Sequence, residues 1–140
     1  MNEDVDYYFK AGFDEMDFDI VTGFLTKAYW SLGIGKDEVI RAAQNSALVV
    51  GAFTGDGRQI GYLRVISDKT KFAYVLDVIV DEDRRKQGIG QAMLKYMLAH
   101  PDLKSVGKWV LLTSTAHGVY RNLGFAPVDR PNDWMELKIK

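Results

Sequence analysis

The feature of this sequence that most constrains its fold is an apolar segment followed by a basic, glycine-containing loop and an amphipathic segment. Residues Phe72–Val80 form the most apolar stretch and are rich in β-branched side chains, which predicts a buried central strand. After the polar loop Asp81–Gln87, apolar residues recur at helical spacing over Gly88–His100, and Pro101 ends the pattern. These segments predict a strand, a loop and a crossover helix, the unit of a mixed α/β sheet.

The other elements fit around this unit without a linker or a repeat. Two helices are predicted between the first two strands, and a glycine-containing turn at 54–57 joins the second strand to the third. The predicted strands are Val5–Phe9, Ala47–Phe53, Arg58–Ser67, Phe72–Val80, Lys108–Thr113, Phe125–Val128 and Trp134–Lys140, and the predicted helices are Phe18–Trp30, Lys36–Ser46, Gly88–His100 and Ala116–Leu123. With 140 residues, the chain is expected to form one domain over 1–140 in the order β-α-α-β-β-β-α-β-α-β-β.

Composition and charge exclude several classes of protein. With 18 basic and 19 acidic residues the net charge is −1, so neither nucleic acid nor a membrane is expected as a partner. The chain has no cysteine, which rules out disulfides, thiolate nucleophiles and cysteine-bound metals. His100 and His117 lie on different predicted elements, so no metal site is expected. Without a signal-peptide run or a spanning segment of ~18 apolar residues, the expected compartment is the cytoplasm.

The loop before the third helix meets the physical requirements for binding a phosphate group. The first N–H groups of a helix have no internal acceptor, and the helix dipole adds roughly half a positive charge at that end. Gly88 and Gly90 lack a Cβ atom, so an anion can approach the backbone. Arg84, Arg85 and Lys86 supply positive charge. A Rossmann fingerprint would need glycine at Met93, and a P-loop would need Gly-Lys-Ser/Thr after the second glycine, so neither pattern fits.

Two stretches together resemble the GNAT superfamily of acyl-CoA-dependent N-acetyltransferases. Arg85–Gly90 is similar to the family's pyrophosphate loop, Arg/Gln-x-x-Gly-x-Gly/Ala, and Ala116–Phe125 is similar to its Ala-x-x-x-Tyr-x-x-x-Gly-Phe helix. The resemblance extends from Ala47 onward, and the segment Arg130–Glu136 and the Ala116-His117 pair are similar to a group of short bacterial members of undefined substrate. It implies a GNAT-like α/β domain with a mostly antiparallel central sheet of about six to seven strands and about four helices.

The resemblance also implies acetyl-CoA as cosubstrate and assigns residues to it. The diphosphate is expected on the loop amides, and the pantetheine arm is expected to lie like an added strand along the end of the predicted central strand. Thr113 stands where the family often has asparagine. The expected cofactor-binding residues are Val78, Ile79, Val80, Arg85, Lys86, Gln87, Gly88, Ile89, Gly90, Gln91 and Thr113.

Catalytic and acceptor residues follow from the same resemblance, and each has a structural alternative. Tyr120 matches the family tyrosine that protonates the departing thiolate, or it is a packing tyrosine. Asp77, a carboxylate in an apolar strand, is either a general base or the partner of a backbone or arginine group. His117 is either a proton relay or a structural residue. Tyr29 and Trp30 line the acceptor pocket or belong to the core.

The implied reaction is direct transfer of an acetyl group to a primary amine of a small molecule, in a ternary complex without a covalent enzyme intermediate. The lack of cysteine agrees with direct attack. Three other readings stay open: an acyl-CoA-binding module without turnover, an acetyltransferase acting on a protein or peptide amine, and an interaction domain that binds no coenzyme A. The acceptor, the acyl-chain preference and the oligomeric state, a homodimer included, are not determined by the sequence.

Overall fold

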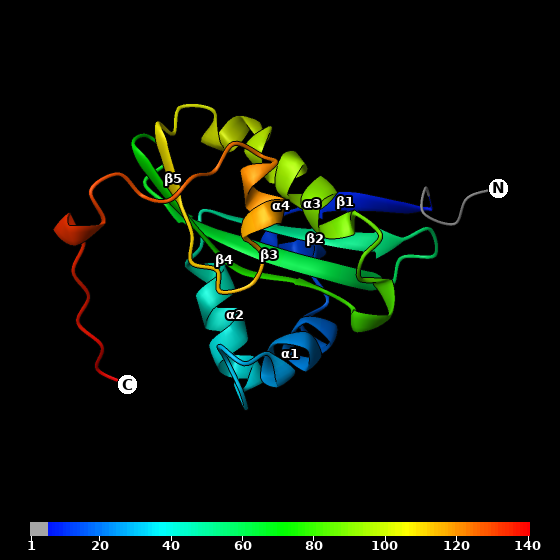
Figure 1. Cartoon of the computed structure of the whole chain (residues 1–140). Helices are drawn as coiled ribbons and strands as arrows, with labels where there is room; N and C mark the ends of the chain where they lie inside the picture. Colours follow the sequence, from blue (N-terminus) through cyan, green and yellow to red (C-terminus); the bar gives the residue numbers. More distant parts are fainter. Residues whose placement is uncertain (1–5) are drawn as a thin grey trace.

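The structure, a computed structural model of the chain, describes residues 6–140 and shows one sheet with helices on both faces (Figure 1). Within these residues the sheet has five strands in the order β1-β2-β3-β4-β5. The first four strands pair antiparallel, and the fifth pairs parallel with the fourth. The strands are β1 (Tyr7–Ala11), β2 (Leu48–Thr54), β3 (Gln59–Ser67), β4 (Phe72–Val80) and β5 (Lys108–Val110).

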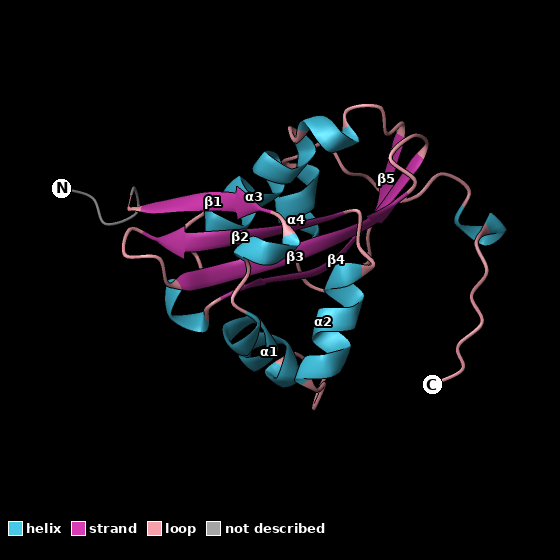
Figure 2. Cartoon of the chain, turned by 180° about the vertical axis from the view of Figure 1, so that it is seen from behind, coloured by secondary structure: helices cyan, strands magenta, loops and turns pink. Residues whose placement is uncertain are grey.

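Two helices lie on each face of the sheet (Figures 1 and 2). One face carries α1 (Phe18–Lys27) and α2 (Lys36–Gln44), and the other carries α3 (Ile89–Leu98) and α4 (His117–Arg121). Short 3-10 turns connect the elements: η2 (Phe13–Glu15), η3 (Glu82–Arg84), η4 (Pro101–Leu103) and η5 (Pro131–Asp133). Over residues 6–140, no helix is long and apolar enough to cross a membrane.

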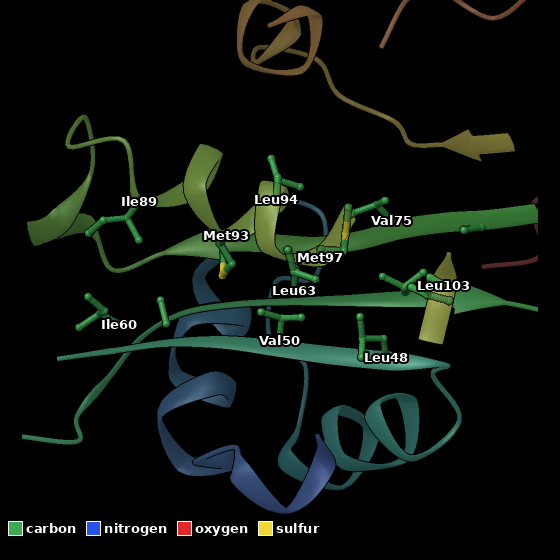
Figure 3. Packing of buried hydrophobic residues seen from close by; sticks show 13 residues of the cluster. Leu48, Val50, Ile60, Leu63, Val75, Ile89, Met93, Leu94, Met97 and Leu103 are labelled. Carbon is green, nitrogen blue, oxygen red and sulfur yellow. The ribbon is translucent and has the colours of Figure 1, made fainter. Parts of the chain in front are cut away.

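The continuous apolar run of β2 is explained by its position between two layers. All seven of its residues are buried, because side chains of successive residues point to opposite faces and both faces are covered. Val50 packs with Met93 and Leu94 of α3 in one core cluster, shown in Figure 3, whereas Val49 packs with Val21 of α1 in a second. The sheet therefore separates two apolar cores, and α3 is fixed by four buried residues: Ile89, Met93, Leu94 and Met97.

The fold class and the four helices are confirmed, but the predicted number of strands is wrong. The sheet has five strands within the described residues, because neither Phe125–Val128 nor Trp134–Lys140 joins it. Arg130 takes a left-handed conformation (φ 54°) and Pro131 starts η5, so the chain turns away from the sheet between the two segments. The strand predicted over Trp134–Lys140 is therefore not observed, and the segment has no pairing partner among residues 6–140.

Smaller differences concern the ends of elements. The first predicted strand, Val5–Phe9, is observed as Tyr7–Ala11, and Val5 lies outside the described residues. The strand predicted over Lys108–Thr113 ends at Val110, where the chain leaves its neighbour. Likewise α1 ends at Lys27 rather than Trp30. Tyr29 and Trp30 therefore lie in the loop after the helix, where they take part in the site described below.

Candidate active site

The site begins where β4 and β5 separate. Their pairing is confined to Phe72–Tyr74 on β4 and Lys108–Val110 on β5, and beyond this point the two strands diverge. In the second half of β4 the register against β3 is interrupted by a β-bulge at Asp77, whose φ of 56° is left-handed. The carboxyl-terminal half of β4 therefore has β3 on one edge and an opening on the other.

The start of α3 faces this opening with free backbone N–H groups. Lys86 (φ 63°) and Gly88 (φ 82°) both take left-handed conformations, and Gly88 is the N-cap of the helix without a side-chain cap. The amides of Gln87 to Gln91 donate no hydrogen bond to any group in residues 6–140. A Cβ atom added at Gly88 would meet no atom within 4 Å, so the space in front of this backbone is open. Such a row of unpaired amides at a helix start is suited to an anion.

The arginines around the loop are held by specific contacts. Arg85 donates from Nε to the carbonyl of Val80 at 3.0 Å, which brings its guanidinium across the end of β4. Arg58, at the start of β3, donates to the carboxylate of the buried Asp81 at 2.8 Å. Asp81 in turn accepts from the backbone of Asp83 at 3.1 Å and thereby caps η3. These contacts fix the path of the loop between β4 and α3.

A cleft of about 1300 Å³ connects the loop to the end of α1 and the start of α4. Most of the residues that the sequence assigned to the cofactor and the acceptor lie in its wall. They are Tyr29, Trp30, Val78, Ile79, Val80, Arg85, Lys86, Gly88, Ile89, Gly90 and Gln91. The cleft is thus bounded by the open half of β4, the amide row and the aromatic pair after α1. Its size exceeds that of an ordinary small-molecule pocket, which suits a long ligand.

Five predicted site residues lie outside this wall. Gln87, Thr113, Asp77, His117 and Tyr120 are not among the residues that line the cleft. The Thr113 hydroxyl accepts from the amide of Ala116 at 3.0 Å and so shapes the turn before α4. His117 is an exposed residue at the first position of that helix.

Tyr120 is half-buried behind the cleft wall. It packs against the core cluster that contains α3, and its ring meets Phe125 edge-on at 5.8 Å. Its neighbour Val119, and Ala116 one turn earlier, both line the cleft. Burial raises the pKa of the Tyr120 phenol, so the hydroxyl is protonated at neutral pH.

Asp77 makes the contacts of a structural partner rather than of a free base. Its carboxylate accepts from Arg64 Nε at 2.6 Å and from Trp30 Nε1 at 3.1 Å. The Arg64 and Asp77 side chains are only 16% and 15% exposed, so the pair is shielded from water. Two donors on one carboxylate hold the bulge of β4 to β3 and to Trp30 in the loop after α1. Of the two interpretations of Asp77, the geometry favours the arginine partner.

Substitution of Asp77 by asparagine tests this assignment. Asp77→Asn keeps the shape and an acceptor for Trp30, but it leaves Arg64 without its counter-charge. We expect the free energy of unfolding to fall by about 1–3 kcal/mol, measured by urea denaturation. If Asp77 is only the partner of Arg64, the pH dependence of kcat/KM should keep its shape. Loss of the acidic limb of that profile would instead identify Asp77 as the general base.

A hydrogen bond links Tyr29, in the cleft wall, to Ser114, the neighbour of the cleft-lining Thr115. Their hydroxyl oxygens are 2.9 Å apart, although the residues come from the loop after α1 and the loop after β5. The rings of Tyr29 and Trp30 meet edge-on at 5.1 Å, which makes the pair a single aromatic wall. Both rings remain exposed, so the interpretation of these aromatics as core residues is wrong.

Several residues of the cleft were missed by reasoning from the sequence. They are Ile20, Gly23, Phe24, Lys27, Arg58, Thr115, Ala116 and Val119, among others. Those on α1 lie within three turns before Tyr29 and could have been found by following the helix backwards. Arg58 carries no local signal, because it reaches the cleft only through the pairing of β3 with β4. Within residues 6–140, no group of three His, Asp or Glu side chains is placed to hold a metal ion.

Comparison with known proteins identifies the class to which this fold and cleft belong. The sequence profile of the acetyltransferase (GNAT) domain matches residues 44–127. A structure from Xanthomonas campestris pv. campestris, described as an acetyltransferase of the GNAT family, is 33% identical with a TM-score of 0.86, covering 95% of this chain and 93% of that one. The chain therefore belongs to the GNAT acetyltransferase family. It is an N-acetyltransferase that uses acetyl-CoA as its cosubstrate.

More distant structures share the fold. An acetyltransferase from Deinococcus radiodurans R1 is 20% identical with a TM-score of 0.78, covering 99% of this chain and 92% of that one. A predicted acetyltransferase from Clostridium acetobutylicum, whose crystal structure is with acetyl-CoA, is 18% identical with a TM-score of 0.70, covering 94% and 96%. A search of curated protein sequences gave no match.

Proposed function

We propose that this enzyme transfers the acetyl group of acetyl-CoA directly to a primary amine of a small molecule, with both substrates bound in the cleft at once. The observation that carries the proposal is the row of free amides from Gln87 to Gln91 at the mouth of the opening between β4 and β5. The anion site and the strand edge meet in one continuous cleft, as a ligand with a diphosphate and an extended arm requires.

The residues present fit coenzyme A at both of these places. The amides of Gly88 and its neighbours would hold the diphosphate, because the space before Gly88 is open and the amides have no acceptor within the described chain. The edge of β4 near Val78 would hold the pantetheine arm as an added strand. Bound there, acetyl-CoA supplies an activated thioester, and a β4 amide beside it polarises the carbonyl.

Arg85 has a second role in this arrangement. Its side chain already covers the carbonyl of Val80, so the arm pairs with the part of β4 before that residue. The guanidinium stays at the cleft wall, where its charge offsets that of the diphosphate. In this way Arg85 marks the boundary between the diphosphate site and the strand edge.

Tyr120 supplies the proton for the leaving thiolate in this proposal. The half-buried phenol is protonated at neutral pH and lies next to Val119, which lines the cleft. A small shift of the short helix α4 on binding brings its hydroxyl to the sulfur, and catalytic hydrogen bonds commonly tighten only in the complex. Direct attack by the amine needs no nucleophile from the protein, in keeping with a chain without cysteine.

The acceptor occupies the end of the cleft near Tyr29 and Trp30. The bond between the Tyr29 and Ser114 hydroxyls links the loops after α1 and β5 beside this end. We expect this link to limit access by a bulky acceptor, such as a side chain on a folded protein. The exposed rings of the pair suit an acceptor with an apolar or cationic group beside its amine.

Binding of the cofactor is tested first, by thermal unfolding with and without acetyl-CoA. At 100 times its Kd the ligand should stabilise the protein by about 2.7 kcal/mol, which raises Tm by several degrees for a domain of this size. A salt of equal ionic strength serves as control. No shift at any concentration would identify the chain as an interaction domain that does not bind coenzyme A.

Turnover is tested next, with a panel of amines and detection of the released thiol. Release that depends on a small primary amine supports the proposal. Cofactor binding without release for any amine or peptide would indicate a regulatory module, and release only with peptides or proteins would indicate a protein acceptor.

A further inference from the structure

One wall of the cleft is formed by α1 and the loop after it, on the face of the sheet opposite α3 (Figures 1 and 2). The amide row lies at the start of α3, so this wall is the part of the cleft that the proposed diphosphate site leaves to the acceptor. The helix contributes Ile20, Gly23, Phe24 and Lys27 to the wall, and the loop contributes Tyr29 and Trp30. Most of these side chains are apolar or aromatic.

The polar atoms of the two aromatic residues are already bonded within the protein. Trp30 Nε1, the only polar atom of the indole, donates to the Asp77 carboxylate at 3.1 Å. The Tyr29 hydroxyl lies 2.9 Å from the hydroxyl of Ser114. The two rings therefore present mainly carbon to the cleft. A hydroxyl-rich acceptor placed against them would lose hydrogen bonds to water without finding partners.

The charge on this wall is positive. Lys27 is its one charged residue, and it forms no ion pair with any group in residues 6–140. The nearby carboxylate of Asp77 is compensated by Arg64 at 2.6 Å. The acidic residues that line the cleft lie elsewhere, at η3 directly before the basic loop: Asp81, Glu82 and Asp83. An acceptor with a second cationic group would therefore meet Lys27 and no uncompensated carboxylate on this wall.

Gly23 leaves room on the same wall. It lies in the interior of α1, where glycine is less favourable for a helix than any residue except proline. A Cβ atom added at Gly23 would meet no atom within 4 Å, so the space in front of the helix is open. Phe24 and Trp30 line the cleft on the carboxyl-terminal side of this opening. A bulky group can thus approach the helix backbone and still contact aromatic side chains.

We propose, on the basis of the function proposed above, that the acceptor is a primary amine with an aromatic or similarly bulky apolar body and no second cationic group. Its body lies in the space before Gly23 and contacts Phe24 and the ring of Trp30. Of the two kinds of group that suit the aromatic rings, apolar and cationic, the charge of the wall selects the apolar one. Amino sugars are disfavoured by their hydroxyl groups, and polyamines are disfavoured by Lys27.

Trp30 is the residue that determines this preference, and Asp77 is a positioning residue that acts through it. The bulge in β4 brings the Asp77 carboxylate to the layer of α1, where it meets the indole N–H. The ring is 45% exposed, so packing alone restricts it little, and the bond to Asp77 fixes its orientation. A ring that is held before the acceptor arrives loses less conformational freedom on binding.

A panel of four amines tests the acceptor class. Rates at saturating acetyl-CoA are measured with 2-phenylethylamine, ethanolamine, glucosamine and spermidine, and the hydrolysis without amine is subtracted. The value of kcat/KM for phenylethylamine should exceed each of the others by roughly tenfold or more, because only its phenyl ring gains from burial on an apolar wall. Equal values, or a preference for glucosamine or spermidine, would overturn this acceptor class and leave acetyl transfer to amines intact. No transfer to any amine would overturn both.

Substitution of Trp30 tests the residue through the ratio of kcat/KM for phenylethylamine to that for ethanolamine. Trp30→Ala should lower this ratio by roughly tenfold. Trp134→Ala is the matched control, because Trp134 is also 45% exposed but does not line the cleft, and its ratio should stay at the native value. A purely structural effect would lower both rates and keep the ratio. An unchanged ratio in Trp30→Ala would therefore remove Trp30 from acceptor recognition.

The positioning role of Asp77 is tested by the same ratio. Asp77→Ala removes the acceptor of the indole N–H and should lower the ratio, whereas Asp77→Asn keeps an oxygen acceptor and should retain it. Trp30→Phe gives the same information without disturbing the ion pair of Asp77, because it keeps an aromatic ring but cannot donate to the carboxylate. A native ratio in Trp30→Phe would show that the bond to Asp77 does not matter for the acceptor.

The space before Gly23 is tested by filling it. Gly23→Leu places a branched side chain where the body of the acceptor is proposed to lie, and it should lower the ratio by roughly tenfold. Thermal unfolding with acetyl-CoA shows whether the variant still folds and binds its cosubstrate. A folded Gly23→Leu variant with the native ratio would show that the acceptor does not use this space.

Discussion

Replacement of Tyr120 by phenylalanine is expected to lower kcat by roughly 10²–10⁴-fold, with little change in the affinity for acetyl-CoA. The substitution removes one oxygen atom and keeps the ring that packs against Phe125 and the core. The leaving thiolate then loses its proton donor, whereas the amide row at α3 is untouched. Steady-state assays with thiol detection, combined with direct measurement of cofactor binding, separate the two effects.

The pH dependence of kcat is a second test of the proposed acid role of Tyr120. Burial raises the pKa of Tyr120 above the ordinary value of 10.0, so the acid form persists through neutral pH and is lost only above pH 10. A decline of kcat on the alkaline side that disappears in Tyr120→Phe should therefore lie above that pH. Tyr96→Phe serves as the control, because Tyr96 packs against the same core from α3. Unchanged kcat in Tyr120→Phe would leave Tyr120 with a packing role only.

Replacement of Gly88 by alanine is expected to weaken acetyl-CoA binding by roughly 10- to 10²-fold. An added methyl group would enter the open space in front of the N-cap of α3, where the diphosphate is proposed to approach. Loss of one hydrogen bond to a charged group corresponds to about 1.5–3 kcal/mol, which gives this range. Isothermal titration with acetyl-CoA measures the change directly.

Gly33→Ala is a matched control for this substitution. Gly33 has a similar left-handed conformation (φ 77° against 82°), and a Cβ atom there also meets nothing within 4 Å. Both variants therefore carry the same backbone strain of about 1–3 kcal/mol, but Gly33 is not among the residues that line the cleft. Equal affinity in the two variants would argue against diphosphate binding at Gly88.

The fold could be predicted from the sequence as far as local patterns extend. All four α-helices were predicted, and Phe72–Val80 was correctly predicted as a strand. Its prediction as the buried central strand is wrong, because β4 is fourth of the five strands and only three of its nine residues are buried, whereas all residues of β2 are buried. Trp134–Lys140 was predicted as a closing strand, but a local pattern of residues does not reveal what a strand pairs with. The left-handed conformation of Arg130 before η5 turns the following segment away from the sheet, and an arginine in the sequence does not indicate such a conformation.

The placement of the candidate site residues could be predicted where one segment carries them, and it could not where several segments meet. The amide row from Gln87 to Gln91 follows from a glycine-containing helix start and needs no tertiary information. The role of Asp77 could not be read in this way, because its partners Arg64 and Trp30 are 13 and 47 residues distant. Arg58 was missed for the same reason. Contacts between side chains that strand pairing brings together cannot be found from the spacing of the residues in the sequence.

The bulge in β4 changes which side chains of the strand point into each of the two cores. Before the bulge, the odd-numbered Ala73 and Val75 pack in the α3 core; after it, the even-numbered Val78 and Val80 do so, and Ile79 turns to the α1 core. Because the bulge adds one residue, even-numbered side chains after it point to the face that odd-numbered side chains occupy before it. Deletion of Asp77 would return the strand to plain alternation, with Val78 and Val80 still in the α3 core and Ile79 still in the α1 core. The bulge and the contacts of its carboxylate would be lost, but the two layers would keep their side chains. The bulge is therefore a place where the residue count of this strand can fall by one without exchanging its two faces.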